Sequence, residues 1–443
     1  MRVLVAAVPH ASHLNIIIPY AQALQNAGHE VCLGTAPGGE DVVTSAGLTA
    51  VTFGEPTPLS LQNWKKHGLL PDQETRERFA DALALTAEER GHWDVFYQYY
   101  AFNARFFLQR EPRADIDGLI AFGRAWRPDL VLWDAWFPLG GVIAQACGAP
   151  HARVLIGPDY SGWAYETFAA RGGPSVDAVG DNPLTEALRP VAERYGLDVG
   201  DDLVLGRFAL DPVPAERRLT EGAPVRPVRW ITYNGGGVKP AWLHAPPERP
   251  RVAVTLGLSV RLWRRGGDPR LPKIIEALAD QDVEVVATCT SEQLSGVGRL
   301  PDNVRAVDYV PLAQLLPTCS AVVHHGSSGA FLSSIAAGVP QLVVHTGESI
   351  RMVFSGDGDD ISVSNADRDA DSWLTAGYVA ERGAGEAVDH LTQSAADIRT
   401  VIERVLRDPA YRKGAAELRR EWRARPGPAD IVPDLEKLSA ERG

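Results

Sequence analysis

The sequence predicts an α/β protein built from two doubly wound domains, each with a mostly parallel sheet. Strand and helix patterns alternate in two separate series, and a stretch rich in Gly and Pro lies between the series. The chain has 443 residues, which suits two domains of roughly 200 residues better than one core. We expect an N-terminal domain over 1–230, a linker over 231–250 and a C-terminal domain over 251–443.

The first series consists of continuous apolar runs of the kind found in buried parallel strands. These runs are residues 2–8, 29–34, 48–53, 129–133 and 151–155. Helical spacing predicts a helix over Asn15–Ala27, which ends at Gly28, and a second helix around 139–147. Between residues 55 and 115 the strand pattern is lost, and mixed charges with many aromatic residues predict inserted helices and loops.

The second series has the same character. Its predicted strands are 251–256, 283–288, 304–307, 321–323 and 340–344, with helices over 271–279 and 330–337. The Gly- and Pro-rich segments 233–240 and 246–250 precede it and mark the linker. In doubly wound sheets, ligands bind at the carboxyl ends of the strands, so functional residues are expected in the turns there.

Composition limits the classes of partner. The net charge is −12, and neither nucleic acid nor an anionic membrane is expected to bind an acidic chain in general. The four cysteines are far apart and include no C-x-x-C pair, which indicates reduced thiols in a cytoplasmic protein. The apolar start, Val3–Val8, is too short for a signal peptide, and no window is long and apolar enough to span a bilayer.

The segment Ala321–Gly329 is the clearest local indication of a ligand site. A β-branched run ends in two histidines, and a turn of Gly and Ser residues then opens a helix of small residues. The first amides of a helix lack main-chain partners and carry partial positive charge, so this turn suits a phosphate. An ordinary strand-to-helix connection with packed histidines is the alternative. Two further turns, Thr255–Ser259 and Tyr309–Pro311, favour a nucleotide-diphosphate site when taken together with it.

A histidine and an aspartate fall at the corresponding edge of the first predicted sheet. His13 follows the first strand, and Asp134 follows the strand over 129–133. Such a pair can act as a general base and the carboxylate that orients it. A helix-capping histidine and a surface aspartate would give the same spacing, and the spacing alone does not separate the two interpretations.

A series of short motifs runs in order through nearly the whole chain. They include Ser12–Asn15, Ala27–Val31, Pro128–Asp134, Tyr233–Gly235, Thr255–Ser259, Pro301–Val304, Val310–Leu312, Leu316–Cys319, His324–Gly326, Gly338–Gln341 and Arg382–Gly385. With these motifs the chain resembles the inverting GT-B glycosyltransferases of actinomycete natural-product pathways. The resemblance is to the erythromycin- and spinosyn-type branch, which attaches deoxysugars, often aminosugars, to macrolide and aromatic polyketides from dTDP donors. It implies two Rossmann-like domains facing a central cleft, with a C-terminal helix able to pack back on the N-terminal domain.

The resemblance also assigns roles to residues. His13 matches the family's catalytic base, and Asp134 matches its partner carboxylate. The implied donor-binding residues are Thr255, Ser259, Val310, His324, Gly326, Ser327, Ser328, Gly329, Asp371 and Ser372. The predicted acceptor-binding residues are Trp93, Tyr97, Asp159, Tyr160 and Trp163, because aromatic walls suit a flat apolar aglycone. Core filling is the alternative for each of these aromatic residues.

The chain departs from the family pattern in the C-terminal half. Ala330 stands where relatives usually have Thr or Ser, so one phosphate hydroxyl is missing. Asp371 and Ser372 fall on a pair that touches the donor sugar, with Ala370 replacing a tryptophan. Residues 348–369 form an acidic insertion, which predicts a mobile loop suited to a cationic aminosugar. The insertion lacks the calcium-loop pattern, so no metal site is expected.

The predicted activity is transfer of a deoxy- or aminosugar from a dTDP-sugar to a hydroxyl of a polyketide-type aglycone, with inversion and without metal or cofactor. Attack by an aromatic carbon, giving a C-glycoside, stays open. The resemblance also implies a haem-free, cytochrome-like activator protein, and a homodimer is a further expectation. A nucleotide-sugar epimerase of the same fold and a catalytically silent accessory paralogue are the alternatives.

Overall fold

In the computed structural model the residues described are 1–54, 72–101, 114–222, 224–258, 261, 266–345, 353–355, 362–364 and 372–441. The chain divides into two compact units. Met1–Arg229 and Pro426–Gly443 form the first unit, and Trp230–Arg425 forms the second. The end of the chain therefore belongs to the N-terminal unit.

The first unit is built on a seven-stranded sheet of order β3-β2-β1-β4-β5-β6-β7, in which every pair is parallel. Its strands are β1 (Arg2–Ala7), β2 (Glu30–Thr35), β3 (Thr49–Thr52), β4 (Leu130–Asp134), β5 (His151–Val154), β6 (Ala209–Asp211) and β7 (Val225–Pro227). The strand order reverses between β1 and β4. A ligand site is expected at this switch point, beyond the carboxyl ends of the two strands.

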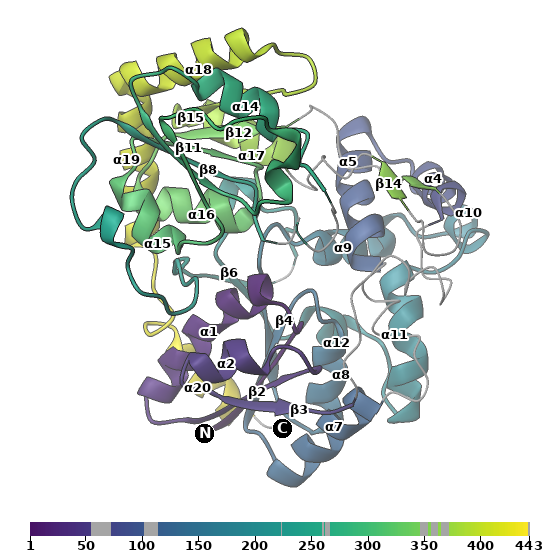
Figure 1. Ribbon diagram of the computed structural model, residues 1–443. Coiled ribbons are helices and arrows are strands. Elements are labelled where there is room, and N and C mark those ends of the chain that lie inside the picture. The colour runs from purple at the N-terminus through teal and green to yellow at the C-terminus, as the bar shows by residue number, and fades with distance from the viewer. Residues whose placement is uncertain are drawn as a thin grey trace. The chain divides into compact units, whose positions relative to one another are not determined.

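Helices cover both faces of this sheet (Figure 1). On one side lie α1 (Ala11–Asn26), α2 (Glu40–Ser45) and the C-terminal α20 (Val432–Ala440), and on the other lie α7 (Ala114–Trp126), α8 (Leu139–Ala146) and α12 (Asp201–Leu205). The remaining helices are α4 (Gln73–Ala82), α5 (Ala87–Val95), the π-helix η1 (Phe96–Ala101), α9 (Tyr160–Arg171), α10 (Pro174–Asp177), α11 (Pro183–Arg194) and the 3-10 turn η2 (Ala215–Arg217). An ion pair of 3.1 Å between His29 Nε2 and Glu436 Oε1 fastens α20 to this unit.

The second unit repeats the plan with a six-stranded parallel sheet of order β10-β9-β8-β11-β12-β15. Its strands are β8 (Arg251–Thr255), β9 (Glu284–Thr288), β10 (Val304–Val307), β11 (Ala321–His324), β12 (Gln341–Val344) and β15 (Gly385–Val388). The order reverses between β8 and β11, where Thr255 and His324 are register partners. The two histidines and the Thr255 turn therefore meet at the switch point of this sheet.

Helices α14 (Leu271–Leu278) and α18 (Ala395–Arg407) cover one face of the second sheet, and α15 (Leu312–Leu315), α16 (Ser328–Ala337) and α19 (Pro409–Ala424) cover the other (Figure 1). The unit also contains α17 (Ser372–Glu381), the 3-10 turns η3 (Ala241–Leu243), η4 (Gln293–Gly296) and η5 (Leu316–Thr318), and an antiparallel pair, β13 (Val353–Ser355) with β14 (Ser362–Ser364). This pair lies within the predicted insertion, most of which is outside the described residues.

The predicted strands and principal helices are present with small shifts at their ends. Helix α1 begins at Ala11 rather than Asn15, because the side chain of His10 caps it. Helix α16 begins at Ser328 rather than Ala330 and ends at Gly338, whose positive φ of 71° suits a C-terminal glycine. The strands β6, β7 and β15 were not predicted, because they are only three or four residues long and have no continuous apolar run.

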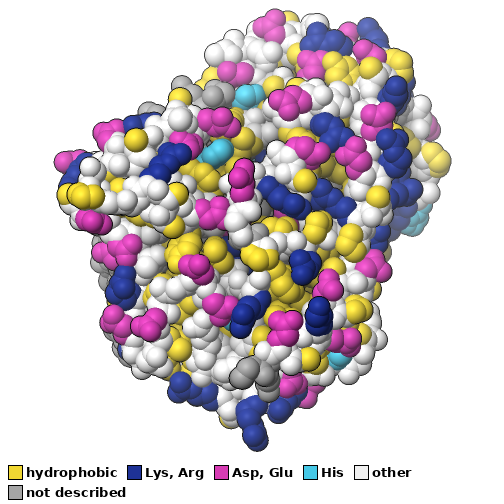
Figure 2. All heavy atoms as spheres, turned by 180° about the vertical axis from the view of Figure 1, so that it is seen from behind, with side chains coloured by type: hydrophobic (Ala, Val, Ile, Leu, Met, Phe, Trp, Pro, Cys, Tyr) yellow, Lys and Arg dark blue, Asp and Glu magenta, His cyan; other side chains and the backbone are white. Residues whose placement is uncertain are grey.

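The surface carries both signs of charge. On the face shown in Figure 2, acidic and basic side chains are interspersed among apolar ones. Within the described part of the chain, no helix has the length and apolar character needed to cross a membrane.

Candidate active site

His13 and Asp134 lie together at the switch point of the first sheet. His13 is in the first turn of α1, Asp134 is the last residue of β4, and 2.7 Å separates His13 Nδ1 from Asp134 Oδ2. Asp134 is fully buried, its second oxygen accepts the Trp136 main-chain N–H at 2.9 Å, and the His13 side chain is 12% exposed. Because the carboxylate can only accept, Nδ1 donates, and Nε2 of the neutral ring is left able to accept a proton.

The structure separates the two interpretations of this pair. The helix-capping histidine is His10, which precedes α1, and not His13. Asp134 is buried and is not a surface aspartate. The Trp136 ring packs edge-on against the His13 ring, with centroids 5.3 Å apart and an interplanar angle of 63°. The imidazole is therefore held by a hydrogen bond and by an aromatic contact, as a positioned base requires.

The glycine- and serine-rich turn after β11 leaves the start of α16 open. Ser327 is the N-cap residue, and within the described residues no side chain bonds to the first amides of this ten-residue helix. Gly326 has φ +86°, and a Cβ there would lie 2.6 Å from Ser372 Cα. No described atom lies within 4 Å of a Cβ built on Gly329. The turn thus combines close packing behind Gly326 with space, among the described residues, around the Cβ position of Gly329, and uncapped amides at a helix N-terminus suit an anion.

The predicted role of His324 as a direct phosphate contact needs correction. The ring is fully buried, Nε2 lies 2.8 Å from Gln341 Oε1, and Nδ1 accepts the Gly326 N–H at 3.0 Å. Both nitrogens are therefore used within the protein, and burial lowers the His324 pKa to about 3. His324 holds the turn in place and has no nitrogen left to offer to a ligand.

His325 is the residue that the sequence interpretation missed. It is 4% exposed, and its buried Nδ1 has no hydrogen-bond partner among the described residues. Burial, and next the charge of Arg270, lower the His325 pKa to about 3. The doublet His324-His325 carried no signal that separates the two residues, because both side chains are buried and only their hydrogen-bond partners differ.

The Thr255 turn abuts His325. Thr255 is buried at the end of β8, and a Cβ on Gly257, whose φ is +79°, would lie 2.5 Å from His325 Cε1. Ser259 lies outside the described residues. Two of the predicted donor turns therefore converge on one histidine.

Other predicted donor residues are spread through the second unit. Val310 is buried in an apolar cluster with Leu315 and Val339. Ser372 is buried against Gly326 and therefore supports the turn from behind. Asp371 lies outside the described residues.

The predicted acceptor aromatics are packed in the helical part of the first unit. Trp93 is 1% exposed, donates its indole N–H to the Arg76 carbonyl at 2.9 Å, and lies within ring contact of Tyr97, with centroids 5.5 Å apart. Tyr97, Tyr160 and Trp163 are also buried, and Trp163 contacts the His92 ring at 5.5 Å. Core filling, the alternative considered from the sequence, describes Trp93 in this structure.

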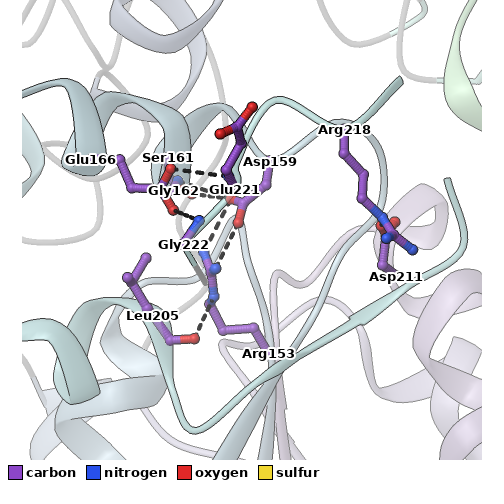
Figure 3. Close-up of polar contacts among 10 residues, drawn as sticks. All are labelled: Arg153, Asp159, Ser161, Gly162, Glu166, Leu205, Asp211, Arg218, Glu221 and Gly222. Carbon is purple, nitrogen blue, oxygen red and sulfur yellow. Dashed lines mark hydrogen bonds and ion pairs between the residues drawn. The ribbon is translucent and has the colours of Figure 1, made fainter. Parts of the chain in front are cut away.

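Asp159 is an internal ion-pair partner and not an exposed acceptor contact (Figure 3). Its two oxygens receive the Arg153 guanidinium at 3.0 and 2.6 Å, and Oδ1 also caps α9 by accepting the Gly162 N–H at 2.9 Å. Both side chains are buried, at 1% and 4% exposed. Breaking such a pair leaves an uncompensated buried charge, so Asp159 fixes the start of α9 against β5.

A metal site needs several ligating side chains close together. Among the described residues, there is no cluster of three or more His, Cys, Asp or Glu side chains arranged to hold a metal.

Comparison with known proteins places the chain in a family. The N-terminal domain model of erythromycin biosynthesis protein CIII-like proteins matches residues 22–257, and the C-terminal domain model matches 272–353 and 361–438. The chain is 41% identical to aclacinomycin-T 2-deoxy-L-fucose transferase of Streptomyces galilaeus, over 100% of this chain and 97% of the relative. It is 35% identical to 10-deoxymethynolide desosaminyltransferase of Streptomyces venezuelae, over 100% and 98%.

Solved structures agree with this assignment. The glycosyltransferase VinC in complex with dTDP has a TM-score of 0.79 and 32% identity, and the spinosyn forosaminyltransferase SpnP has 0.77 and 32%, each over the full length of both chains. The resemblance and fold predicted from the motifs are therefore confirmed. With two doubly wound domains and these relatives, the chain belongs to the erythromycin biosynthesis protein CIII-like family and is a nucleotide-sugar-dependent glycosyltransferase of GT-B fold.

Proposed function

We propose that this protein is an inverting transferase that moves a deoxysugar or aminosugar from dTDP to a hydroxyl of a polyketide-type aglycone. The observation that carries the proposal is the 2.7 Å contact of His13 with the buried Asp134 at the switch point of the first sheet. The open N-terminus of α16 beside His325 supports the donor half of the proposal. The names of the relatives, such as desosaminyltransferase, support a deoxysugar as the transferred group.

In the proposed reaction His13 Nε2 removes the proton from the acceptor hydroxyl while the oxygen attacks the anomeric carbon. The bond from that carbon to the diphosphate oxygen breaks, and dTDP leaves with the electron pair. Asp134 stabilises the imidazolium that forms. A single displacement on the face opposite the leaving group inverts the anomeric configuration.

The leaving diphosphate gains negative charge during this step. The amides at the start of α16 and the hydroxyls of Ser327 and Ser328, both partly exposed, are suited to stabilise that charge. The negative charge of a bound diphosphate favours the imidazolium form of His325, in which Nδ1 can donate to a phosphate oxygen while the ring keeps its hydrogen bond to the Thr255 main chain. We propose that these groups replace a divalent cation and that no cofactor takes part.

Several finer features belong to the same proposal. The aglycone atom is a hydroxyl oxygen in the main case and an aromatic carbon in the variant that gives a C-glycoside. A haem-free, cytochrome-like activator protein and a homodimer are proposed as partners. We place the reaction in the cytoplasm, in keeping with the four free cysteines.

The first experiment is calorimetric titration with dTDP and with UDP, with and without a chelator. Binding that prefers dTDP and ignores the chelator is expected. If neither nucleotide binds, the donor site has been lost, and an accessory role would replace the transferase proposal.

Product analysis tests the reaction itself. We suggest dTDP-2-deoxy-L-fucose alone and together with aclacinomycin T, the sugar and acceptor in the name of the relative with 41% identity. A glycosylated product that requires both substrates supports transfer. A changed sugar in the donor-only reaction would instead indicate an epimerase.

A further inference from the structure

The N-terminus of α1 is capped by a histidine. His10 has extended backbone angles of φ −133° and ψ 136°, and its Nδ1 accepts the Ser12 main-chain N–H at 3.3 Å. The Ser12 hydroxyl oxygen lies 2.6 Å from the same nitrogen. Ser, Thr, Asp and Asn are the usual N-cap residues, so a histidine at this position calls for a physical reason.

His10 also binds the base through the main chain. Its carbonyl accepts the N–H groups of His13 at 3.0 Å and of Leu14 at 2.9 Å, which are the first hydrogen bonds of the helix. The two imidazole rings meet edge to face, with centroids 6.4 Å apart and an angle of 74°. The position of His13 therefore depends on the conformation of His10.

The hydrogen bonds determine which nitrogen of His10 carries the proton. The Ser12 amide can only donate, so Nδ1 holds a lone pair and the ring proton is on Nε2. A second proton on Nδ1 would break the bond with the Ser12 amide, which can only donate, and would reverse the bond with the Ser12 hydroxyl. Burial, and next the neighbouring His13, lower the His10 pKa to about 4, so the cap is uncharged at neutral pH.

We propose that His10 is a positioning residue that caps the helix of the base without adding a charge beside it. The inference rests on the proposed role of His13 as the base. The described groups in contact with the His13 side chain are Asp134, the Trp136 ring and the His10 ring. Among these three groups, the negative charge beside His13 comes from Asp134. An aspartate cap would bring a second negative charge to the imidazole and favour its protonated form.

Three substitutions in the full-length protein separate capping from charge. His10→Asn keeps an uncharged cap, His10→Ala removes the cap, and His10→Asp restores a cap with a negative charge. The His13 ring is titrated by NMR in each variant, which needs no substrate. We expect the midpoint of His13 to stay the same in His10→Asn and to rise by about one pH unit in His10→Asp.

Activity gives the second readout, with dTDP-2-deoxy-L-fucose and aclacinomycin T as the probes. We expect kcat/KM to fall on the order of tenfold in His10→Ala, because the base is less well positioned, and to recover in His10→Asn. In His10→Asp the rising limb of the pH profile should move to higher pH, since the base must lose its proton to act. Thermal unfolding of each variant checks that the fold is retained.

Two results would overturn the inference. Equal kcat/KM in His10→Ala, His10→Asn and the unmodified protein would show that the cap does not position the base. An unchanged His13 midpoint in His10→Asp would show that an uncharged cap is not needed. His13→Ala in the same assay tests the parent proposal separately, because retained transfer there would remove His13 as the base whatever the His10 variants do.

Discussion

The switch points of the two sheets have the same topology but offer different chemistry. In the first unit, the strands β1 and β4 deliver side chains, His13 and Asp134, that are suited to move a proton. In the second unit, β8 and β11 lead into glycine turns, and the helix α16 delivers main-chain amides. A doubly wound sheet fixes where a site lies, while the residues just beyond the strands set the chemistry that the site can perform.

The histidines of the two units differ in the same way. His13 is bound by a carboxylate and stays partly exposed. His324 and His325 are buried beside one another, and burial is the main cause that lowers both of their pKa values to about 3. The proposed base needs an accessible nitrogen, whereas the turn proposed to bind the diphosphate needs a rigid support.

The largest expected effect concerns the first unit. His13→Ala should lower kcat/KM by about a thousandfold or more, because the acceptor hydroxyl loses its general base. The affinity for dTDP should be retained, since the proposed donor residues belong to the second unit. Steady-state kinetics and calorimetry on the same preparation measure both quantities, and loss of dTDP binding would contradict the division of labour between the units.

The next largest effect concerns the packing behind Gly326, in the turn that precedes α16. Gly326→Ala should lower the free energy of unfolding by about 2 kcal/mol or more, because φ is +86° and the new Cβ would lie 2.6 Å from Ser372 Cα. Chemical denaturation measures this loss. Gly329→Ala is the matched control, with an expected change within about 0.5 kcal/mol, since no described atom lies within 4 Å of its Cβ position. Equal losses in both variants would contradict the packing behind Gly326.

Acid should weaken the fold through the buried histidines of the second unit. The His324 pKa is about 3 in the folded chain and 6.5 ordinarily, so the unfolded state binds more protons between these values. Above about pH 6.5 this group does not weaken the fold. As the pH falls below that value the free energy of unfolding decreases, and the loss is about 2 kcal/mol at pH 5. Denaturation from pH 7 to 4.5 measures the slope, which His324→Gln should reduce. An unchanged slope in that variant would show that His324 is not the group that titrates.

The last prediction distinguishes the two adjacent histidines. His325→Asn should weaken dTDP binding by about tenfold with little change in unfolding, because one contact to the diphosphate is lost. His324→Ala should lower stability by about 1 to 3 kcal/mol, because Gln341 and the Gly326 N–H lose their partner. Calorimetry measures dTDP binding and thermal unfolding measures stability in both variants. Weaker dTDP binding in His324→Ala together with unchanged binding in His325→Asn would indicate that His324, and not His325, contacts the phosphate.

The sequence alone determined the two doubly wound domains and the edges where their sites lie. Continuous apolar runs identify the strands along the chain. Because parallel strands end at a common edge, His13 and Asp134 were expected at the same edge although 121 positions separate them. The short strands β6, β7 and β15 escaped prediction, because each is interrupted by a charged residue, Pro or Gly and so has no continuous apolar run.

Only the tertiary structure decided which side chains are available for chemistry. Gln341, on the neighbouring strand, hydrogen-bonds to His324 Nε2. Nδ1 of His325 has no hydrogen-bond partner among the described residues. Trp93 is a core residue whose indole N–H bonds to the Arg76 carbonyl, and Asp159 is the ion-pair partner of Arg153. Composition and spacing identify residue types at an edge, but hydrogen-bond partners and side-chain directions depend on packing between segments far apart in the chain.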